Sequence, residues 1–498
     1  MSNTNARSAA SANGARGNRG TTLLLAAVLV ALTGVTAVAQ AADPAKTPDG
    51  SLTWNGITLY GIVDIGVQYQ SAGAPVSDYF PAGTESVIQK NSHSSVTTVV
   101  GSNLGQSRIG LQGREEFGNG WAGVFKLETF INPWSGHVAD ALKSLTLNNG
   151  VPAASQNTGV DSSIAGQFFG GAAYGGITNA QFGTITVGRQ NGLLADGVGK
   201  YDPMGASNAF SLVGFSGTYA GGGVTEDRRL DNSIKYDLMA GNFHFGAQFQ
   251  PTTSSNPGTT QELVLGFTFP GGSIDAYYMQ KNDAISAGSL SVAQAAQLPC
   301  PYAAPVLPAL PTAPCKALAG GGGNALDKAL SGTISDNTTT AVMAKYSFSN
   351  KTTVFATYEH IDYQNPTHPV APGQATIGGY TLAYVNNTPY PSKRTLGVIW
   401  AGVKVPVSSR VEISGAVYRQ DQNAYWTKDP GCAANGNTVS GQCSGALNVL
   451  SFVADYRFTK RFDLYGGAMW TQVQGGLANG YTFNTSSIDP TIGVRYSF

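Results

Sequence analysis

The stretch TLYGIVDIGVQY at residues 58–69 decides the fold, because its side chains alternate in character from one residue to the next. One face is apolar and the other is mixed, with Leu59, Val63, Ile65, Val67 and Tyr69 set against Thr58, Tyr60, Asp64, Gly66 and Gln68. Successive side chains of a β-strand point to opposite faces of the sheet. The stretch therefore predicts a strand with one face against an apolar environment.

The same alternation recurs to the end of the chain, where TIGVRYSF sets four large side chains against small and polar ones. We expect about sixteen strands, with approximate spans 58–69, 104–116, 121–132, 166–177, 182–190, 229–239, 243–251, 261–269, 273–283, 338–348, 352–363, 392–407, 410–423, 446–459, 461–473 and 489–498. The fourth span contains GQFFGGAAYGG, which is rich in glycine.

The connections between these stretches alternate between short and long. Turns of a few residues fall near 117–120, 240–242, 270–272, 349–351, 408–409 and 459–460, and long connections near 70–103, 133–165, 191–228, 284–337, 364–391, 424–445 and 474–488. Outer-membrane barrels have short periplasmic turns and long outer loops, and their strands cross the membrane in about ten residues. We therefore predict an all-β protein, an antiparallel transmembrane barrel of about sixteen strands.

Composition agrees with that fold and excludes several others. Of 498 residues, only 12% are charged, 42% are hydrophobic and 64 are glycine. The hydrophobic share is too high for a disordered chain, and 29 basic residues against 29 acidic ones give no sign of nucleic-acid binding. A belt of side chains facing lipid tolerates little charge, which accounts for the low charged fraction.

The N-terminus predicts export. Residues 1–20 carry three arginines and no acidic residue, residues 21–39 are apolar, and small residues follow in the pattern A-x-A. This is the pattern of a cleaved secretory signal peptide, which we place at residues 1–41, and it leaves a single barrel domain at 42–498. A membrane anchor is the alternative. We expect the mature protein in the bacterial outer membrane, in contact with its lipid.

Four cysteines in an exported chain suggest disulfide bonds, and they allow three pairings. The local pairing, which we favour, joins Cys300 to Cys315 and Cys432 to Cys443. The spacing of the cysteines and of the five histidines gives no indication of a metal site, and we expect no cofactor.

Several motifs, in this order, resemble the general porins of Gram-negative bacteria, most closely those of the beta-proteobacterial type: TLYGIVDIGV, SRIGLQGREEFGNGWAGVFKLET, FGTITVGRQ, RLDNSIKYD and GVRYSF. The resemblance implies a homotrimer of sixteen-stranded barrels that lets small hydrophilic solutes and ions diffuse passively. It also implies that the third outer loop, at about 191–228, folds inward, and that the barrel assembly machinery reads the terminal Phe498.

In similar porins, basic residues on the wall of the barrel face acidic residues on that loop. Arg108 and Arg229 match such wall positions, and alternation also turns Lys235 toward the lumen. The further candidates for the constriction are Arg114 and Lys126 on the wall and Asp196, Asp202 and Glu226 on the loop, some of which are equally consistent with plain solvated charges. The sequence departs from the family where Gln167-Phe168-Phe169 stands in place of a basic residue, which argues against a full arginine cluster.

Two other functions compete with a general pore. A barrel enzyme requires a catalytic constellation near the rim, and the serines, histidines and aspartates of this sequence form no such motif. A channel specific for sugars or aromatic compounds requires a pocket that sequence patterns do not reveal.

Overall fold

The computed structural model describes residues 52–73, 94–138, 168–214, 228–252, 258–289, 330–370, 376–377, 380–381, 384–387, 390–426, 428–433, 439–479, 481 and 483–498. Several sequence predictions lie outside these residues: the signal peptide at 1–41, Glu226, Cys300 and Cys315.

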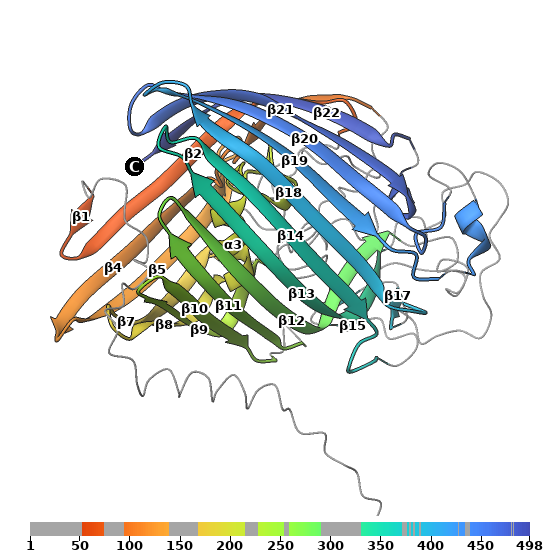
Figure 1. Ribbon diagram of the computed structural model, residues 1–498, viewed down its shortest axis with the longest axis horizontal. Coiled ribbons are helices and arrows are strands. Elements are labelled where there is room, and N and C mark those ends of the chain that lie inside the picture. The colour runs from red at the N-terminus through yellow and green to blue at the C-terminus, as the bar shows by residue number, and fades with distance from the viewer. Residues whose placement is uncertain are drawn as a thin grey trace, which may run out of the picture.

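Sixteen long strands form one closed antiparallel barrel, as the alternation predicts (Figure 1). They are β2 (Ile57–Gln70), β4 (Arg108–Gly118), β5 (Trp121–Asn132), β7 (Ala172–Asn179), β8 (Gly183–Asn191), β9 (Arg229–Ala240), β10 (Phe243–Gln250), β11 (Thr260–Phe269), β12 (Gly272–Ser289), β13 (Leu330–Ser347), β14 (Thr353–Gln364), β18 (Arg394–Pro406), β19 (Val411–Gln422), β20 (Gly445–Arg457), β21 (Phe462–Gly475) and β22 (Ser486–Ser497).

Shorter elements accompany the barrel strands. They are β1 (Thr53–Trp54), β3 (Val96–Gly101), β6 (His137–Val138), β15 (Thr376–Ile377), β16 (Tyr380–Thr381), β17 (Tyr384–Asn386), the α-helix α3 (Leu193–Tyr201) and the 3-10 helices η2 (Leu212–Gly214), η4 (Pro430–Ala433) and η6 (Gly476–Ala478). Among the described residues, no helix has the length and apolar character needed to cross a membrane.

The barrel closes where the first long strand pairs with the last. β2 and β22 are antiparallel from Ile62 opposite Ser497 to Gln68 opposite Thr491, and Gly61 exchanges two backbone hydrogen bonds with Phe498. Glycine is required at this seam, because a Cβ on Gly493 would lie 2.2 Å from the hydroxyl of Tyr465. That hydroxyl donates to the buried carboxylate of Asp64 at 2.5 Å, on the inner side of β2.

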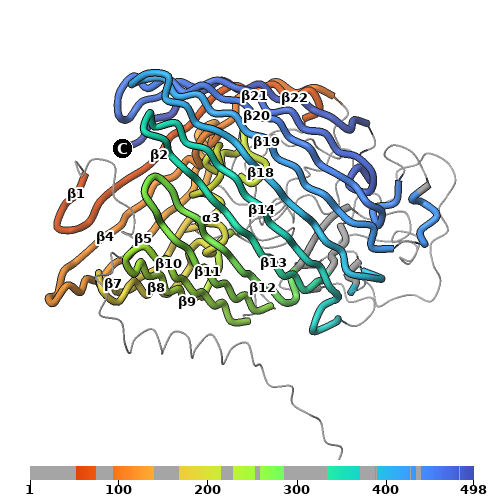
Figure 2. The backbone as a smooth tube through the Cα atoms, viewed as in Figure 1, coloured from red at the N-terminus to blue at the C-terminus, as the bar shows by residue number. Residues whose placement is uncertain are grey.

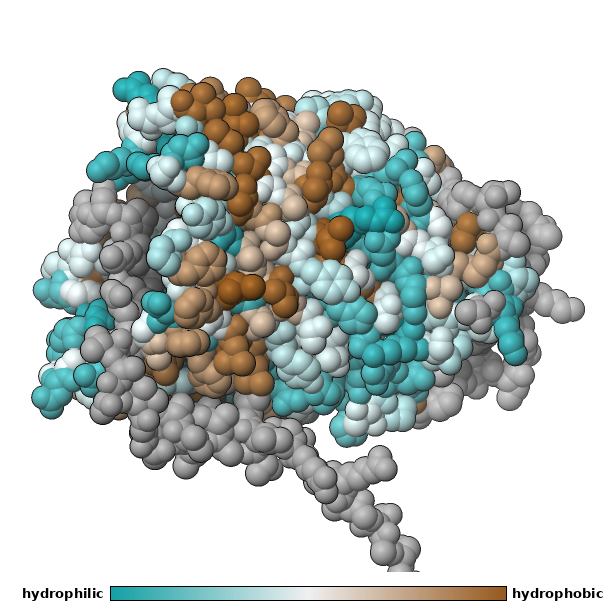
Figure 3. Space-filling model, in the orientation of Figure 1, coloured by the Kyte–Doolittle hydropathy of each residue, from teal (hydrophilic) through white to brown (hydrophobic). Residues whose placement is uncertain are grey.

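The two faces of the strands differ as the sequence predicts. On β2, Val67 and Tyr69 are exposed, whereas Asp64 and Gln68 are buried inside the barrel. On the face shown in Figure 3, the exposed apolar side chains of successive strands gather in a band, with hydrophilic residues on either side of it. The outer surface is therefore suited to a lipid bilayer rather than to water.

The connections are short at one end of the barrel. Two-residue turns join β9 to β10 and β11 to β12, and the other tight hairpins gather at the same end, on the left in Figure 2. This arrangement confirms the expected division between turns and loops.

The second and fourth predicted strands start later in the structure than predicted. The second strand does not start at residue 104, because residues 102–107 leave the ladder and separate β3 from β4, both of which pair with β2. The side chain of Asp64 fills the gap and accepts hydrogen bonds from the backbone N–H groups of Leu104 (2.8 Å) and Gly105 (3.0 Å). The fourth strand runs from 172 to 179 instead of 166 to 177.

Strands β12 and β13 also extend farther than predicted, because pairing resumes beyond an irregularity between Lys281 and Ala284. Asp283 has a positive φ there, and its backbone N–H donates to the carboxylate of Asp336 on the facing strand at 2.8 Å. The alternation is broken at this point, so a pattern of period two ends β12 too early and starts β13 too late.

The apolar band yields a stability prediction. Leu265 lies midway along β11 and is 63% exposed on the outer face. Leu265→Arg should lower the free energy of unfolding in lipid vesicles by about 2–4 kcal/mol, because the charge must enter the hydrocarbon layer. Val407→Arg, in the turn between β18 and β19, is the matched control, with an expected cost of about 0–1 kcal/mol. Equal effects in urea titrations of the two variants would contradict a membrane-facing band.

Candidate functional site

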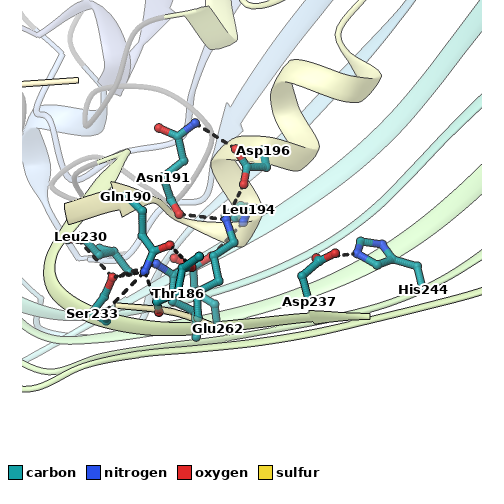
Figure 4. Close-up of polar contacts among 12 residues, drawn as sticks. Thr186, Gln190, Asn191, Leu194, Asp196, Leu230, Ser233, Asp237, His244 and Glu262 are labelled. Atoms are coloured by element: carbon teal, nitrogen blue, oxygen red, sulfur yellow. Dashed lines mark hydrogen bonds and ion pairs between the residues drawn. The ribbon is translucent and has the colours of Figure 1, made fainter. Parts of the chain in front are cut away.

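Residues 192–214, called here the inner loop, lie inside the barrel after β8. Their first part is α3, whose residues Leu193, Leu194, Val198 and Tyr201 share one buried helix face. Gly192 offers no side-chain cap to this helix, and the buried Glu262 of β11 takes that role: its carboxylate accepts the N–H of Leu194 at 2.8 Å (Figure 4). A carboxylate at a helix N-terminus is favoured by the orphan N–H groups and the helix dipole.

The inner loop is next fastened to the wall formed by β12, β18 and β19. The hydroxyl of Tyr201 donates to Ser273 at 2.9 Å, and the indole N–H of Trp400 donates to the carbonyl of Tyr201 at 3.3 Å. Asp202 is buried and accepts the hydroxyl of Tyr418 at 2.5 Å and the N–H of Ala206 at 2.6 Å. Burial raises the pKa of Asp202 despite these hydrogen bonds, which favour its charged form.

The far end of the inner loop reaches the seam of the barrel. The ring of Phe210 packs edge-on against Tyr465 of β21, and the N–H of Ala209 donates to the carbonyl of Asn103 at 3.0 Å. The loop thus runs along the inner wall from β11 to β21. Its apolar residues and the inward side chains of these strands form the hydrophobic core, which lies within the barrel.

A different group of side chains covers the strands that the inner loop leaves uncovered; we call Tyr60, Arg108, Lys126, Glu128 and Arg229 the charged wall. The Glu128 carboxylate is its centre: it accepts the hydroxyl of Tyr60 at 2.8 Å and pairs with Lys126 at 3.4 Å and Arg108 at 3.5 Å. Two cations therefore flank one carboxylate, and the side chain of Arg108 remains 33% exposed to the lumen.

Arg229, at the start of β9, belongs to the same group. Its guanidinium lies 4.5 Å above the ring of Phe130, two residues from Glu128 on the same face of β5, and its Nε–H donates to the carbonyl of Gly171 at 3.0 Å. The structure thus brings together three of the basic residues predicted for the constriction, Arg108, Lys126 and Arg229.

Lys235 and Asp196 form an ion pair of 2.5 Å where the inner loop leaves β8. Enclosure in the barrel would by itself raise the pKa of Asp196, but the charge and the hydrogen bond of Lys235 outweigh this effect and lower that pKa. Asn191 also donates to Asp196 at 2.9 Å (Figure 4). This pair joins the root of the loop to the wall.

The remaining predicted residues lie elsewhere. Arg114 pairs with Glu116 near the turn between β4 and β5, at 2.7 Å, and both are exposed. Asp202 is turned away from water, as described above. Cys432 and Cys443 form a disulfide bond, which confirms this half of the local pairing. Asp429 lies beside the pair, but oxidised cysteines offer no thiolate for a metal ion.

Sequence reasoning missed Glu128 and Glu262. A signal for Glu128 was present, because it lies two residues after Lys126 and alternation puts both on one face of β5. No sequence signal identifies Glu262, because its partner is a backbone N–H of a loop distant in sequence.

Comparison with known proteins gives consistent results. The model of a family described as Gram-negative porin matches residues 26–476. The chain is 28% identical over 191 residues to an outer membrane porin protein of Bordetella pertussis, and the match covers 38% of this chain and 41% of that protein. The chain therefore aligns with less than half the length of this relative.

Two solved structures share the fold. An anion-selective porin from Comamonas acidovorans matches with a TM-score of 0.53 and 15% identity, over 89% of this chain and 99% of that one. OmpT of Vibrio cholerae, an outer membrane protein solved in a trimer form, matches with a TM-score of 0.51 and 13% identity, over 89% and 99% of the two chains.

The buried hydrogen bond between Tyr418 and Asp202 can be tested by removing the hydroxyl. Tyr418→Phe leaves a buried carboxylate without one donor and should lower the free energy of unfolding by about 1–3 kcal/mol at pH 7. The effect should be smaller at pH 4: because burial raises the pKa of Asp202, its neutral form is favoured and gains least from the donor. Tyr456→Phe, whose exposed hydroxyl lies 3.5 Å from Arg410, is the control. Denaturant titrations at both pH values that show equal, small effects would argue against this anchor.

Proposed function

Because the chain belongs to the Gram-negative porin family, we propose that it forms a water-filled channel for the passive diffusion of small hydrophilic solutes and ions across the outer membrane. The observation that carries the proposal is the division of the lumen: the inner loop covers the wall from β11 to β21, and the charged wall on β2, β4, β5 and β9 faces the remaining space. A passive pore needs water, width and a field, and no catalytic group. We accordingly propose that the protein is not an enzyme.

The constriction in this proposal is formed by the charged wall and the inner loop. Arg108, Lys126 and Arg229 contribute positive charge, and Glu128 neutralises one equivalent of it. Lys235 and Asp196 compensate each other at the root of the loop. The excess of cations supports a preference for anions, weaker than a complete arginine cluster would give. Arg114 and Asp202 contribute little here, since one lies at a turn and the other is buried.

Further elements of the proposal concern assembly. Residues 1–41 are the cleaved signal peptide, and the inward-folded third loop spans about 191–228. The chain forms a homotrimer, and the trimer form of the fold neighbour from Vibrio cholerae supports this state. Phe498, whose backbone extends the ladder at Gly61, is the residue that the barrel assembly machinery recognises.

Ion selectivity tests the constriction. Arg108→Ala and Arg229→Ala should each lower the ratio of anion to cation permeability, and Glu128→Gln should raise it. A unit charge at about 4 Å in water is worth about 1 kcal/mol, which corresponds to about a fivefold change in local ion occupancy. Reversal potentials under a KCl gradient in planar bilayers give the ratio. Arg114→Ala is the control and should leave it unchanged. Unchanged selectivity in both arginine variants and in their double mutant would refute the assignment.

The single-channel current tests the function itself. The purified protein should produce stepwise conductance that rises in proportion to KCl concentration, as expected for a wet pore. A general pore should show no saturable block by sugars, whereas saturable block by one solute class would indicate the alternative, a solute-specific channel. Absence of conductance steps from folded protein in the bilayer would refute both forms of the proposal.

A further inference from the structure

A second arginine site lies apart from the charged wall, at the outer ends of β14, β18 and β19. It consists of Tyr363, Tyr390, Arg394, Gln422 and Tyr425, called here the Arg394 group. Arg394 and Tyr363 face each other in register and lie on the inner face, since each is two residues from a buried core residue, Leu396 or Ile361, and so shares its face. The group therefore borders the lumen on its outer side.

Aromatic rings surround the guanidinium of Arg394. Its centre lies 4.8 Å from the ring of Tyr363 and 6.0 Å from that of Tyr425. The ring of Tyr390 lies 6.0 Å from Tyr363 and 5.7 Å from Tyr425, so the three rings form one continuous cluster. Tyr363 and Tyr425 are buried, whereas Arg394 and Tyr390 are half-buried and keep part of their surface accessible.

The charge of Arg394 has no acidic counterpart in the part of the chain that the structure describes, where no aspartate or glutamate lies within ion-pair distance of it. The adjacent Lys393 is already paired with Asp362, and Arg419, on the opposite face of β19, is paired with Asp421 at 2.6 Å. The Nε–H of Arg394 donates to Gln422 and a further bond joins it to Tyr390. Since arginine carries five N–H donors, donors remain for a ligand.

The position of Arg394 is fixed through Gln422. The Gln422 side-chain NH₂ donates to the carbonyls of Gly441 and Cys443, both at 2.8 Å, so its oxygen is directed at the Nε–H of Arg394, also at 2.8 Å. Cys443 is in turn bonded to Cys432. The loop closed by the disulfide thus positions the amide of Gln422, and this amide positions the guanidinium of Arg394 before any ligand binds. Such preorganisation reduces the entropy cost of binding.

We propose that the Arg394 group is a binding site for a small aromatic carboxylate at the outer side of the lumen. A planar guanidinium binds a carboxylate through two parallel hydrogen bonds, and this pairing is among the strongest that side chains offer. The half-buried ring of Tyr390 provides a surface on which the aromatic ring of the ligand stacks. The site concentrates such solutes at the entrance, and in this respect it rests on the proposed channel function.

Benzoate is the probe, with neutral benzamide as its isostere. Isothermal titration calorimetry of the full-length protein in detergent should show saturable binding of benzoate and none of benzamide. Arg394→Gln should weaken benzoate binding at least about tenfold, since a charge-assisted hydrogen-bonded pair is lost. Arg394→Lys keeps the charge but loses the two parallel N–H donors of the guanidinium, and it should weaken binding severalfold. Arg419→Gln, a paired arginine on the adjacent strand, should bind as the wild type does.

Conductance in KCl is measured on the same preparations and shows that each variant is folded and inserted. Conductance steps without saturable benzoate binding to the wild type would overturn the site and leave the channel intact. Benzoate binding without conductance would overturn the channel and leave the site. Binding by Arg394→Gln at wild-type affinity, or equal binding of benzamide and benzoate, would also overturn the site.

Discussion

The hydrogen-bonded closure of β2 on β22 is the constraint on which the rest of the structure depends. A bilayer supplies no water to unpaired backbone groups, so a sheet can span it only as a closed barrel. The seam is crowded on its inner side, where Gly493 leaves room for the hydroxyl of Tyr465 to reach Asp64. Asp64 also holds residues 104 and 105 out of the ladder, and the adjacent Asn103 contacts the inner loop. Closure of the wall and placement of the loop are therefore connected through one carboxylate.

Closure also dictates how the interior is used. Because the outer face is given over to lipid, the only place for a conventional hydrophobic core is inside the barrel. The inner loop supplies part of that core, with residues such as Leu194 and Phe210, and inward side chains such as Met343 and Trp400 supply most of the rest. The residues of the charged wall lie on strands that the loop does not cover. Water in the lumen can solvate these side chains. The charged wall can therefore hold more cations than acids, because it is not desolvated on all sides.

Much of the fold could be predicted from the sequence, because alternation with period two is a local property. The stretch at 58–69 and the terminal TIGVRYSF indicate both the strand and the face that meets lipid. The prediction failed at residues 102–107 and beyond Lys281, where the ladder is interrupted and the period is lost. The basic residues of the charged wall could be predicted from the sequence, since alternation shows which face of its strand each one occupies. The roles of Glu262 and the Arg394 group could not be predicted, because their partners come together only when distant strands and loops meet in the closed barrel.

The location of the hydrophobic core gives its residues a second consequence besides stability. In a soluble protein, trimming a buried side chain leaves a void sealed off from solvent. Here the core lies between the wall and the inner loop, so in the proposed channel a smaller residue at a buried position such as Met343 or Trp400 would let the loop settle closer to the wall and change the width of the passage as well as loosen the packing. Substitutions in the interior would thus shift the size-exclusion limit of the proposed channel while the lipid-facing surface stays unchanged. The permeability of the proposed channel and the stability of the fold then depend on the same side chains.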